Sequence, residues 1–245
     1  EIKERKQLLV KDIEFLETIY RSQFQESHSA VGNFQGKTTV IIGGTDGIGA
    51  AVAEEINRLK GNVISVSRRT GVNINDGHSV DKFLKHLRSL NRNIDSFVIS
   101  AGEMKVSNFI DQNIEDLNSE ISTNFTSTVM LIHKIYPFLR ESRGHLLLFS
   151  SSSFSKGRSG YAVYSAAKAA IVNFSQAIAE EWMEDGVKVN VVCPQRTNTR
   201  MRRANFLDED EASLLPVTLV AKKSVDVLLS ASTGSVFQIK KGMLE

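Results

Sequence analysis

The chain has 245 residues, 41% of them hydrophobic and 24% charged, which is typical of a globular domain that buries one substantial core. Its net charge of +2 gives no reason to expect a nucleic acid as a partner. No apolar stretch of the sequence reaches the roughly 18–20 residues of a membrane-spanning helix, and the charged first residues differ from a signal peptide. We therefore expect a cytoplasmic protein without a nucleic-acid or membrane partner.

The first 35 residues differ in character from the rest. Residues 1–24 repeat apolar side chains at helical spacing among many charges, and residues 25–35 are polar. We predict an N-terminal helix and linker over residues 1–35, followed by one domain over residues 36–245. The helix is expected to pack on its own domain or on a partner, because interspersed acidic residues argue against a helix that binds calmodulin or a membrane surface. The chain does not begin with Met, which suggests a piece of a longer protein.

Short apolar runs alternate with longer helical patterns in the rest of the chain. The expected strands span residues 38–42, 63–66, 97–99, 146–149, 187–193 and 236–239. The expected helices span residues 50–59, 80–90, 161–184 and 219–229, and a long helical stretch ends near Leu139. Nearly continuous apolar strands between helices are typical of a parallel sheet covered on both faces. We predict an α/β fold, a Rossmann-type doubly wound parallel sheet in a single domain.

A glycine-rich turn links the first expected strand to the first helix. It reads Gly43-Gly44-Thr45-Asp46-Gly47-Ile48-Gly49. Glycines let the backbone turn tightly and approach a pyrophosphate, whose charge is met by the free N–H groups of a helix N-terminus. With a strand before it and a helix after it, the turn predicts a dinucleotide site formed by Gly43, Thr45, Asp46, Gly47, Ile48 and Gly49.

The spacing Gly-x-x-x-Gly-x-Gly resembles the short-chain dehydrogenase/reductase family, and the resemblance runs from about residue 36 to residue 240. In that family an acidic residue at the end of the second strand binds the ribose hydroxyls of NAD. Here the strand ends Val66-Ser67-Arg68-Arg69, and guanidinium groups favour the 2′-phosphate of NADP(H). The family's Asn-Asn-Ala-Gly segment is matched by Ser100-Ala101-Gly102, where only Ala-Gly is intact. The resemblance thus implies NADP(H), held in part by Ser67, Arg68, Arg69, Ser100, Ala101 and Gly102.

Tyr164 and Lys168 lie four residues apart near the start of an expected helix, so they share one helical face. An adjacent ammonium favours the phenolate, which is expected to bring the pKa of Tyr164 from about 10 toward neutrality. The family resemblance implies that Tyr164 is the proton donor and that Lys168 also binds the nicotinamide ribose. It further implies that the Ser151 hydroxyl orients the carbonyl oxygen and that Asn124 holds a water of a proton relay.

Ser151 stands in a run of four serines, and Asn124 is also readable as a residue that bends the long central helix. The catalytic residues that we expect are Asn124, Ser151, Tyr164 and Lys168, with no metal ion.

The fifth expected strand contains the single cysteine, Cys193, which we interpret as a buried strand residue rather than a nucleophile. The segment after this strand reads as a polar, arginine-rich loop. In the family a Pro-Gly pair and then a Thr that contacts the nicotinamide carboxamide follow this strand. Pro194 and Thr199 match, whereas Gln195 replaces the glycine. The predicted cofactor contacts of this segment are Pro194, Thr197 and Thr199, in addition to Tyr164 and Lys168 from the helix.

Two cationic loops are expected to flank the substrate at the carboxyl ends of the strands. One follows the fifth strand and the other precedes Tyr164. Several cations suit an anionic substrate, and guanidinium groups suit a phosphate above all. Arg202 and Arg203 are readable equally as part of this site or as solvated surface. The predicted contacts of a small phosphorylated substrate are Ser151, Lys156, Arg158, Arg196 and Arg200.

Two strings, Gly-Gly-Thr-Asp-Gly-Ile-Gly and Cys-Pro-Gln-Arg-Thr-Asn-Thr-Arg-Met-Arg, resemble the reductase domain of the bacterial bifunctional ribulose 5-phosphate reductase/CDP-ribitol pyrophosphorylases. This resemblance implies the reduction of D-ribulose 5-phosphate to D-ribitol 5-phosphate with NADPH, for the synthesis of CDP-ribitol and of capsule or wall polymers. It also implies a fused or associated cytidylyltransferase domain.

Two alternatives stay open at the level of the sequence. A short-chain reductase that acts on a 3-oxoacyl thioester or an uncharged sugar has the same fold and the same catalytic group. A non-catalytic Rossmann scaffold domain is the second alternative, and the intact set of catalytic residues argues against it. The family resemblance also implies a homo-oligomer that packs through the helical regions 114–139 and 161–184.

Overall fold

The computed structural model describes residues 34–242. The helix predicted over residues 1–24 and most of the linker lie outside the described residues, as do residues 243–245. Over the described part, six strands form one sheet in the order β2-β1-β3-β4-β5-β6, and every pairing is parallel. The strands are β1 (Thr38–Ile42), β2 (Asn62–Val66), β3 (Ser96–Ile99), β4 (His145–Phe149), β5 (Lys188–Pro194) and β6 (Val236–Ile239). The predicted α/β doubly wound sheet is confirmed.

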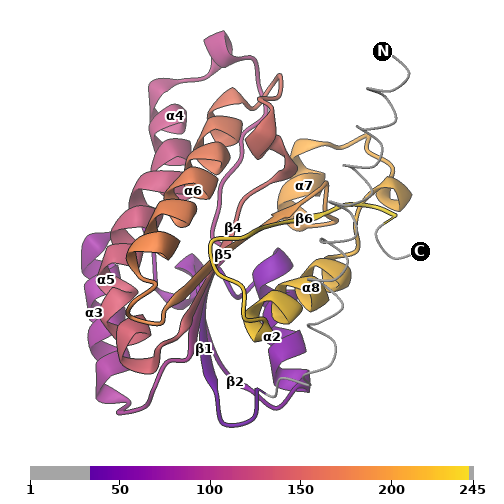
Figure 1. Cartoon of the computed structure of the whole chain (residues 1–245). Coiled ribbons are helices and arrows are strands. Elements are labelled where there is room, and N and C mark those ends of the chain that lie inside the picture. Colours follow the sequence, from indigo (N-terminus) through magenta and orange to yellow (C-terminus); the bar gives the residue numbers. More distant parts are fainter. Residues whose placement is uncertain (1–33, 243–245) are drawn as a thin grey trace, which may run out of the picture. The chain divides into compact units, whose positions relative to one another are not determined.

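Helices cover both faces of this sheet (Figure 1). One face carries α3 (Gly77–Ser89), α4 (Ile114–Ile121), α5 (Ser127–Ser142) and α6 (Ala162–Glu181). The other carries α2 (Gly47–Arg58) and α8 (Val217–Leu229). Residues 34–242 include no helix that combines the length and the apolar character needed to cross a bilayer.

The alternation of side chains along the strands explains why the sequence requires helices on both sides. Val40 and Ile42 of β1 pack into the core beneath α3, α5 and α6, whereas Ile41 between them packs into the core beneath α2 and α8. All five residues of β1 are buried, and so are all those of β3 and β4. A strand buried on both faces has no polar alternation, which is why these segments read as continuous apolar runs.

Two elements differ from the sequence-based expectation. The long central helix is present over residues 114–142, but it is not α-helical throughout, because a π-helical turn at Ser122–Thr126 lies between α4 and α5. The segment after β5 is not all loop, because it contains the short helix α7 (Arg200–Asn205). Thr199 starts α7, since its side chain accepts a hydrogen bond from the backbone N–H of Arg202 at 3.2 Å.

The order of the strands creates a topological switch point between the neighbouring strands β1 and β3. β1 and β3 are neighbours, yet the connection that leaves β1 runs through α2 to β2 on one face, and the connection that leaves β3 runs through α4 and α5 to β4 on the other. In open parallel sheets a ligand binds outside the carboxyl ends of the strands at such a point. The segments that follow β1, β2, β3, β4 and β5 carry almost all of the predicted site residues.

Candidate active site

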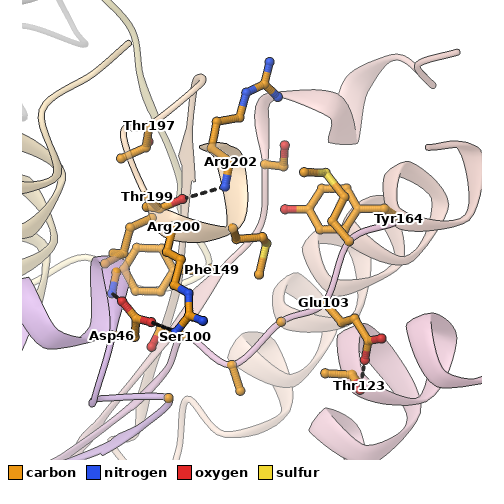
Figure 2. Close-up of a pocket in the computed structure, with 18 of the residues that line it drawn as sticks. Asp46, Ser100, Glu103, Thr123, Phe149, Tyr164, Thr197, Thr199, Arg200 and Arg202 are labelled. Carbon is orange, nitrogen blue, oxygen red and sulfur yellow. Dashed lines mark hydrogen bonds and ion pairs between the residues drawn. The ribbon is translucent and has the colours of Figure 1, made fainter. Parts of the chain in front are cut away.

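A cavity of about 650 Å³ opens at the carboxyl ends of the strands, and Figure 2 shows the side chains around it. Its lining includes every predicted cofactor residue except Gly49: Gly43, Thr45, Asp46, Gly47, Ile48, Ser67, Arg68, Arg69, Ser100, Ala101, Gly102, Tyr164, Lys168, Pro194, Thr197 and Thr199. Ser151, Arg196 and Arg200 line the same cavity. The structure therefore brings residues from five separate segments of the sequence to one site.

The glycine turn fits a dinucleotide because side chains would fill it. Gly43 and Gly47 have backbone φ angles of +87° and +53°, a region that favours glycine. A Cβ at Gly43 would lie 2.6 Å from the backbone nitrogen of Ala101. A Cβ at Gly49 would lie 2.2 Å from the Ser100 hydroxyl oxygen, so Gly49 packs the start of α2 against the neighbouring segment instead of lining the cavity.

The end of β2 presents two exposed arginines to the cavity. Ser67 caps a 3-10 helix at Arg68–Thr70, and the Thr45 hydroxyl donates to the Ser67 hydroxyl at 2.7 Å, which ties this turn to the glycine turn. Arg69 pairs with the carboxylate of Asp46 at 3.2 Å. The segment Val72, Asn73, Ile74 and Asn75 also lines this end of the cavity. Sequence reasoning missed it, because short polar and apolar loop residues carry no pattern of their own.

The predicted catalytic pair lies at the other end of the cavity. α6 begins at Ala162, so Tyr164 and Lys168 occupy its first two turns and face the same side. The Lys168 ammonium nitrogen lies 5.5 Å from the centre of the Tyr164 ring and donates to the carbonyl oxygen of Phe149 at 3.0 Å. Ser151 follows β4 and caps the 3-10 helix Ser152–Ser155. This end of the cavity therefore holds a phenol, an ammonium and a hydroxyl together.

The pKa of Tyr164 differs from the expectation. Burial raises it to about 12, while a hydrogen bond with Ser151 acts in the opposite direction. Burial also lowers the pKa of Lys168 to about 8. The prediction that the ammonium brings the Tyr164 pKa toward neutrality is wrong here, because desolvation penalises both charged forms. At neutral pH the phenol is protonated, which is the form that a proton donor requires.

Asn124 lies in the π-helical turn between α4 and α5 and is buried. Its side-chain amide donates to the carbonyl oxygens of Glu103, at 2.6 Å, and Glu120, at 2.9 Å. A Cβ at Gly102 would lie 3.1 Å from the side-chain oxygen Oδ1 of Asn124 and 3.7 Å from the ammonium nitrogen of Lys168. The Asn124 amide and the Lys168 ammonium are therefore close to each other. Asn124 therefore has a structural role in the bend of the long helix, which the sequence had left open. It also lies near Lys168, where a residue of the proton relay would have to lie.

The arginines after β5 fall on two sides of the cavity. Arg200 extends toward the glycine turn, 3.9 Å from the Asp46 carboxylate (Figure 2). Arg196 and Arg202 share the carboxylate of Glu209 instead. Arg202, which was not among the predicted contacts, lines the cavity with only 14% of its side chain exposed. The run of arginines in the sequence indicated that some of them line the site, but which of them do so depends on the register of α7.

Lys156 and Arg158 are exposed and do not line the cavity, so the structure does not bring them together with the other predicted substrate contacts. The 3-10 helix after Ser151 carries the chain outward, and the backbone N–H of Arg158 is then fixed to the Ser165 hydroxyl at 3.3 Å. Cys193 is 1% exposed, and burial raises the pKa of its thiol to about 12. A buried thiol that stays protonated is a poor nucleophile, which agrees with a structural role.

Residues 70–210 match the sequence model of the short chain dehydrogenases. The chain belongs to the short-chain dehydrogenase family. It is therefore an NAD(P)-dependent oxidoreductase, and the resemblance seen in the sequence is confirmed.

Two curated relatives illustrate the range of the family. The bifunctional ribulose 5-phosphate reductase/CDP-ribitol pyrophosphorylase of Haemophilus influenzae is 37% identical over 82% of this chain. The match covers 42% of that enzyme, so the chain spans about two fifths of its length. The 3-oxoacyl-[acyl-carrier-protein] reductase of Escherichia coli is 29% identical, over 75% of this chain and 82% of that protein.

Solved structures share the fold. A putative NAD(P)-dependent gluconate 5-dehydrogenase from Beutenbergia cavernae with bound NADP superimposes with a TM-score of 0.78, at 20% identity, over 88% of this chain and 99% of the other. A 3-ketoacyl-(acyl-carrier-protein) reductase from Brucella melitensis complexed with NADH gives a TM-score of 0.79, at 19% identity, over 86% and 99%. One neighbour holds NADP and the other NADH, so the fold alone leaves the choice of dinucleotide open.

Proposed function

We propose that the chain reduces a small phosphorylated ketose with NADPH, and that the substrate is D-ribulose 5-phosphate, which becomes D-ribitol 5-phosphate. The observation that carries this proposal is the pair Arg196 and Arg202, which line the cavity and share the carboxylate of Glu209. The Arg202 guanidinium stacks on Phe206, which is connected through Tyr161 to Tyr164. Two guanidinium groups there suit a phosphate rather than an acyl chain. The relative from Haemophilus influenzae, named as a ribulose 5-phosphate reductase, supports the same substrate.

The residues present fit NADP(H). The glycine turn offers the N-terminal N–H groups of α2 to a pyrophosphate. Arg68 and Arg69 at the end of β2 suit a 2′-phosphate, and no carboxylate stands at that position in the strand end Val66-Ser67-Arg68-Arg69. Lys168 would bind the nicotinamide ribose, and Pro194, Thr197 and Thr199 would contact the carboxamide. Bound NADPH would supply the hydride to the ketone carbon.

The chain's own residues account for the movement of the proton. The Ser151 hydroxyl donates to the carbonyl oxygen of the substrate and stabilises the negative charge that develops there. Tyr164, protonated at neutral pH because burial raises its pKa, transfers its phenolic proton to the same oxygen. Lys168 stabilises the resulting phenolate, since its ammonium is the adjacent cation. Asn124, next to Lys168, holds the water through which the proton is restored.

The product suggests the setting of the reaction. D-ribitol 5-phosphate is the sugar part of CDP-ribitol, so we propose that a cytidylyltransferase domain, fused or associated, consumes it for capsule or wall polymers in the cytoplasm. We further propose a homo-oligomer that packs through the α4–α6 region. Ile114, Ile121 and Met130 of α4 and α5 are 66%, 43% and 61% exposed, and such apolar side chains are typical of an interface. Light scattering after size exclusion tests the oligomer, and a monomer at micromolar concentration contradicts it.

The proposed function is tested by following NADPH oxidation with a panel of carbonyl substrates. We expect D-ribulose 5-phosphate to give a kcat/KM at least about a hundredfold above that of D-ribulose, because the phosphate contributes about 3 kcal/mol or more through two guanidinium groups. NADH should replace NADPH poorly. Turnover of an acetoacetyl thioester, or of D-ribulose as fast as its phosphate, would contradict the proposed substrate. Failure with every carbonyl compound would favour the scaffold alternative.

A further inference from the structure

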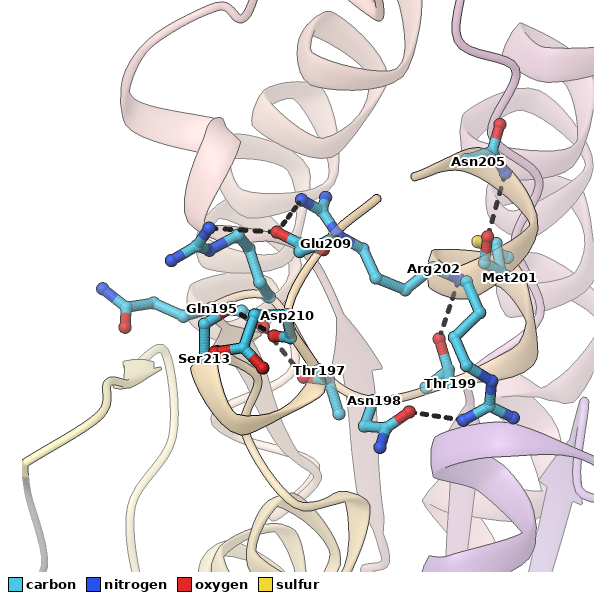
Figure 3. Close-up of polar contacts among 12 residues, drawn as sticks. Gln195, Thr197, Asn198, Thr199, Met201, Arg202, Asn205, Glu209, Asp210 and Ser213 are labelled. Carbon is cyan, nitrogen blue, oxygen red and sulfur yellow. Dashed lines mark hydrogen bonds and ion pairs between the residues drawn. The ribbon is translucent and has the colours of Figure 1, made fainter. Parts of the chain in front are cut away.

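Arg196, Arg202 and Glu209 form a compact cluster, which we call the arginine clamp. Figure 3 labels two of its members, Arg202 and Glu209. Arg202 donates to Glu209 through two nitrogens, Nε to Oε2 at 2.6 Å and Nη2 to Oε1 at 2.8 Å. Arg196 donates through Nη1 to Oε1 at 3.0 Å. One carboxylate thus holds two guanidinium groups in fixed positions, and this geometry is far more specific than a chance surface pair.

The clamp is partly buried and is fixed on a second side by aromatic rings. The side chains of Glu209 and Arg202 are 12% and 14% exposed. The guanidinium carbon of Arg202 lies 3.5 Å from the centre of the Phe206 ring. Phe206 packs edge-on against Tyr161 at 5.9 Å, and Tyr161 packs against Tyr164 at 6.2 Å. The position of the Arg202 guanidinium is therefore tied through these rings to the phenol that donates the proton.

The two arginines line the cavity, whereas Glu209 does not. A guanidinium has five N–H donors, and Glu209 uses only some of them. Within residues 34–242, no hydrogen bond engages Arg202 Nη1 or the Nε and Nη2 of Arg196, so these nitrogens can bind a second anion. Because Glu209 is not part of the lining, it can fix the two guanidinium groups without touching what they bind.

We propose that Glu209 is a positioning residue, which sets Arg196 and Arg202 as one recognition unit for the phosphate of the substrate. This inference rests on the proposed function for the identity of the ketose. The anion site itself is independent of that identity. The alternative is that Glu209 only neutralises the arginines and competes with a bound phosphate, and this alternative predicts an effect of opposite sign.

The test compares Glu209→Gln with a matched control, Asp208→Asn, in the full chain saturated with NADPH. Both variants remove one carboxylate, but the side chain of Asp208 is exposed one residue away from the clamp. Titration calorimetry with inorganic phosphate measures the anion site alone, since NADPH fills the site of the 2′-phosphate. We expect Glu209→Gln to weaken phosphate binding about tenfold, as loss of orientation of one charged hydrogen bond predicts. Asp208→Asn should leave phosphate binding unchanged.

Steady-state kinetics supply the second measurement. Glu209→Gln should raise the KM for D-ribulose 5-phosphate about tenfold and change kcat less than threefold, with the KM for D-ribulose unaltered, because only binding of the phosphate is lost. Arg202→Lys, which keeps the charge but not the planar fork, should show the same pattern and serves if Glu209→Gln does not fold.

The outcomes separate the two proposals. Phosphate binding that is unchanged or tighter in Glu209→Gln overturns the positioning role, even if the wild-type chain reduces the phosphorylated ketose. A wild-type chain that does not reduce D-ribulose 5-phosphate, yet binds phosphate in a manner that depends on Glu209, overturns the proposed substrate and retains the positioning role.

Discussion

Replacing Arg69 with Ala tests how the chain selects its dinucleotide. Arg69 stands at the end of β2, lines the cavity and is paired at 3.2 Å with Asp46 of the glycine turn, where 58% of the arginine side chain is exposed. If Arg69 binds the 2′-phosphate, the variant should lose affinity for NADPH and retain its affinity for NADH, which has no such phosphate.

The structure sets the size of the effect. A hydrogen bond between charged groups contributes about 1.5–3 kcal/mol. To bind the phosphate, however, Arg69 must give up its exposed pair with Asp46, which is worth about 0–1 kcal/mol. The difference of roughly 0.5–3 kcal/mol corresponds to a Kd for NADPH that rises about 2- to 150-fold. Asp46→Asn keeps a side-chain acceptor for the Gly47 N–H but removes the competing charge, so it should bind NADPH somewhat more tightly.

Both variants can be followed by the fluorescence of bound NADPH and NADH. Arg58→Ala is a suitable control, because Arg58 is the last residue of the same α2 helix and pairs with Glu55, three residues away, at 2.6 Å. An equal loss of affinity for NADH and NADPH in Arg69→Ala would refute a contact with the 2′-phosphate, and so would an unchanged Kd for NADPH.

Three further predictions concern pH and packing. Burial lowers the pKa of Lys168 to about 8, so kcat/KM for NADPH, which reports the free enzyme, should fall as the pH rises above about 8. A profile that stays flat to pH 10 would contradict the requirement for a charged Lys168. Burial also lowers the pKa of His145 to about 3, and Asn190 donates to its Nε2 at 2.8 Å, so the folded state holds the neutral imidazole. The neutral His145 contributes stability that is fully present above the unfolded pKa of 6.5 and is lost as the pH falls, by about 2 kcal/mol at pH 5. Urea unfolding should show this difference in the free energy of unfolding between pH 7 and pH 5 in the wild type. The variant His145→Gln should not show it. Gly49→Ala places a Cβ 2.2 Å from the Ser100 hydroxyl, so it should weaken NADPH binding at least about tenfold by displacing the glycine turn, and an unchanged Kd would show that the turn adapts.

Most of the fold was predictable because its signals are local. The strands β1, β3 and β4 are buried on both faces, which leaves continuous apolar runs, and the glycine turn lies between a strand and a helix. The sequence offered Asn124 as a residue that bends the long central helix, but the π-helical turn at Ser122–Thr126 was not itself predictable, because the amide of Asn124 also donates to the carbonyl oxygen of Glu103, which only the folded chain brings near it. Four of the six residues of α7 are polar, and so short a helix offers little periodic signal in the sequence; the cap at Thr199 begins it.

The candidate site shows the same division. The residues that carry family motifs were placed from the sequence, and all but Gly49 and Asn124 line one cavity. Pairing of arginines with carboxylates was not predictable, because Glu209 meets Arg196 and Arg202 only after α7 turns the chain back. The direction of the Tyr164 pKa was also missed, because spacing along a helix reports that Lys168 is a neighbour but not how much water burial removes.

The central claim is that the phenol of Tyr164 delivers the proton to the carbonyl oxygen during reduction. The most direct measurement is single-turnover oxidation of bound NADPH by D-ribulose 5-phosphate in Tyr164→Phe, with the Kd for NADPH determined in parallel. We predict a Kd within about threefold of wild type and a rate at least about a thousandfold lower, within the 10²–10⁴-fold range of general acid catalysis. A variant that binds NADPH normally and reduces the ketose at a rate close to wild type would contradict the account.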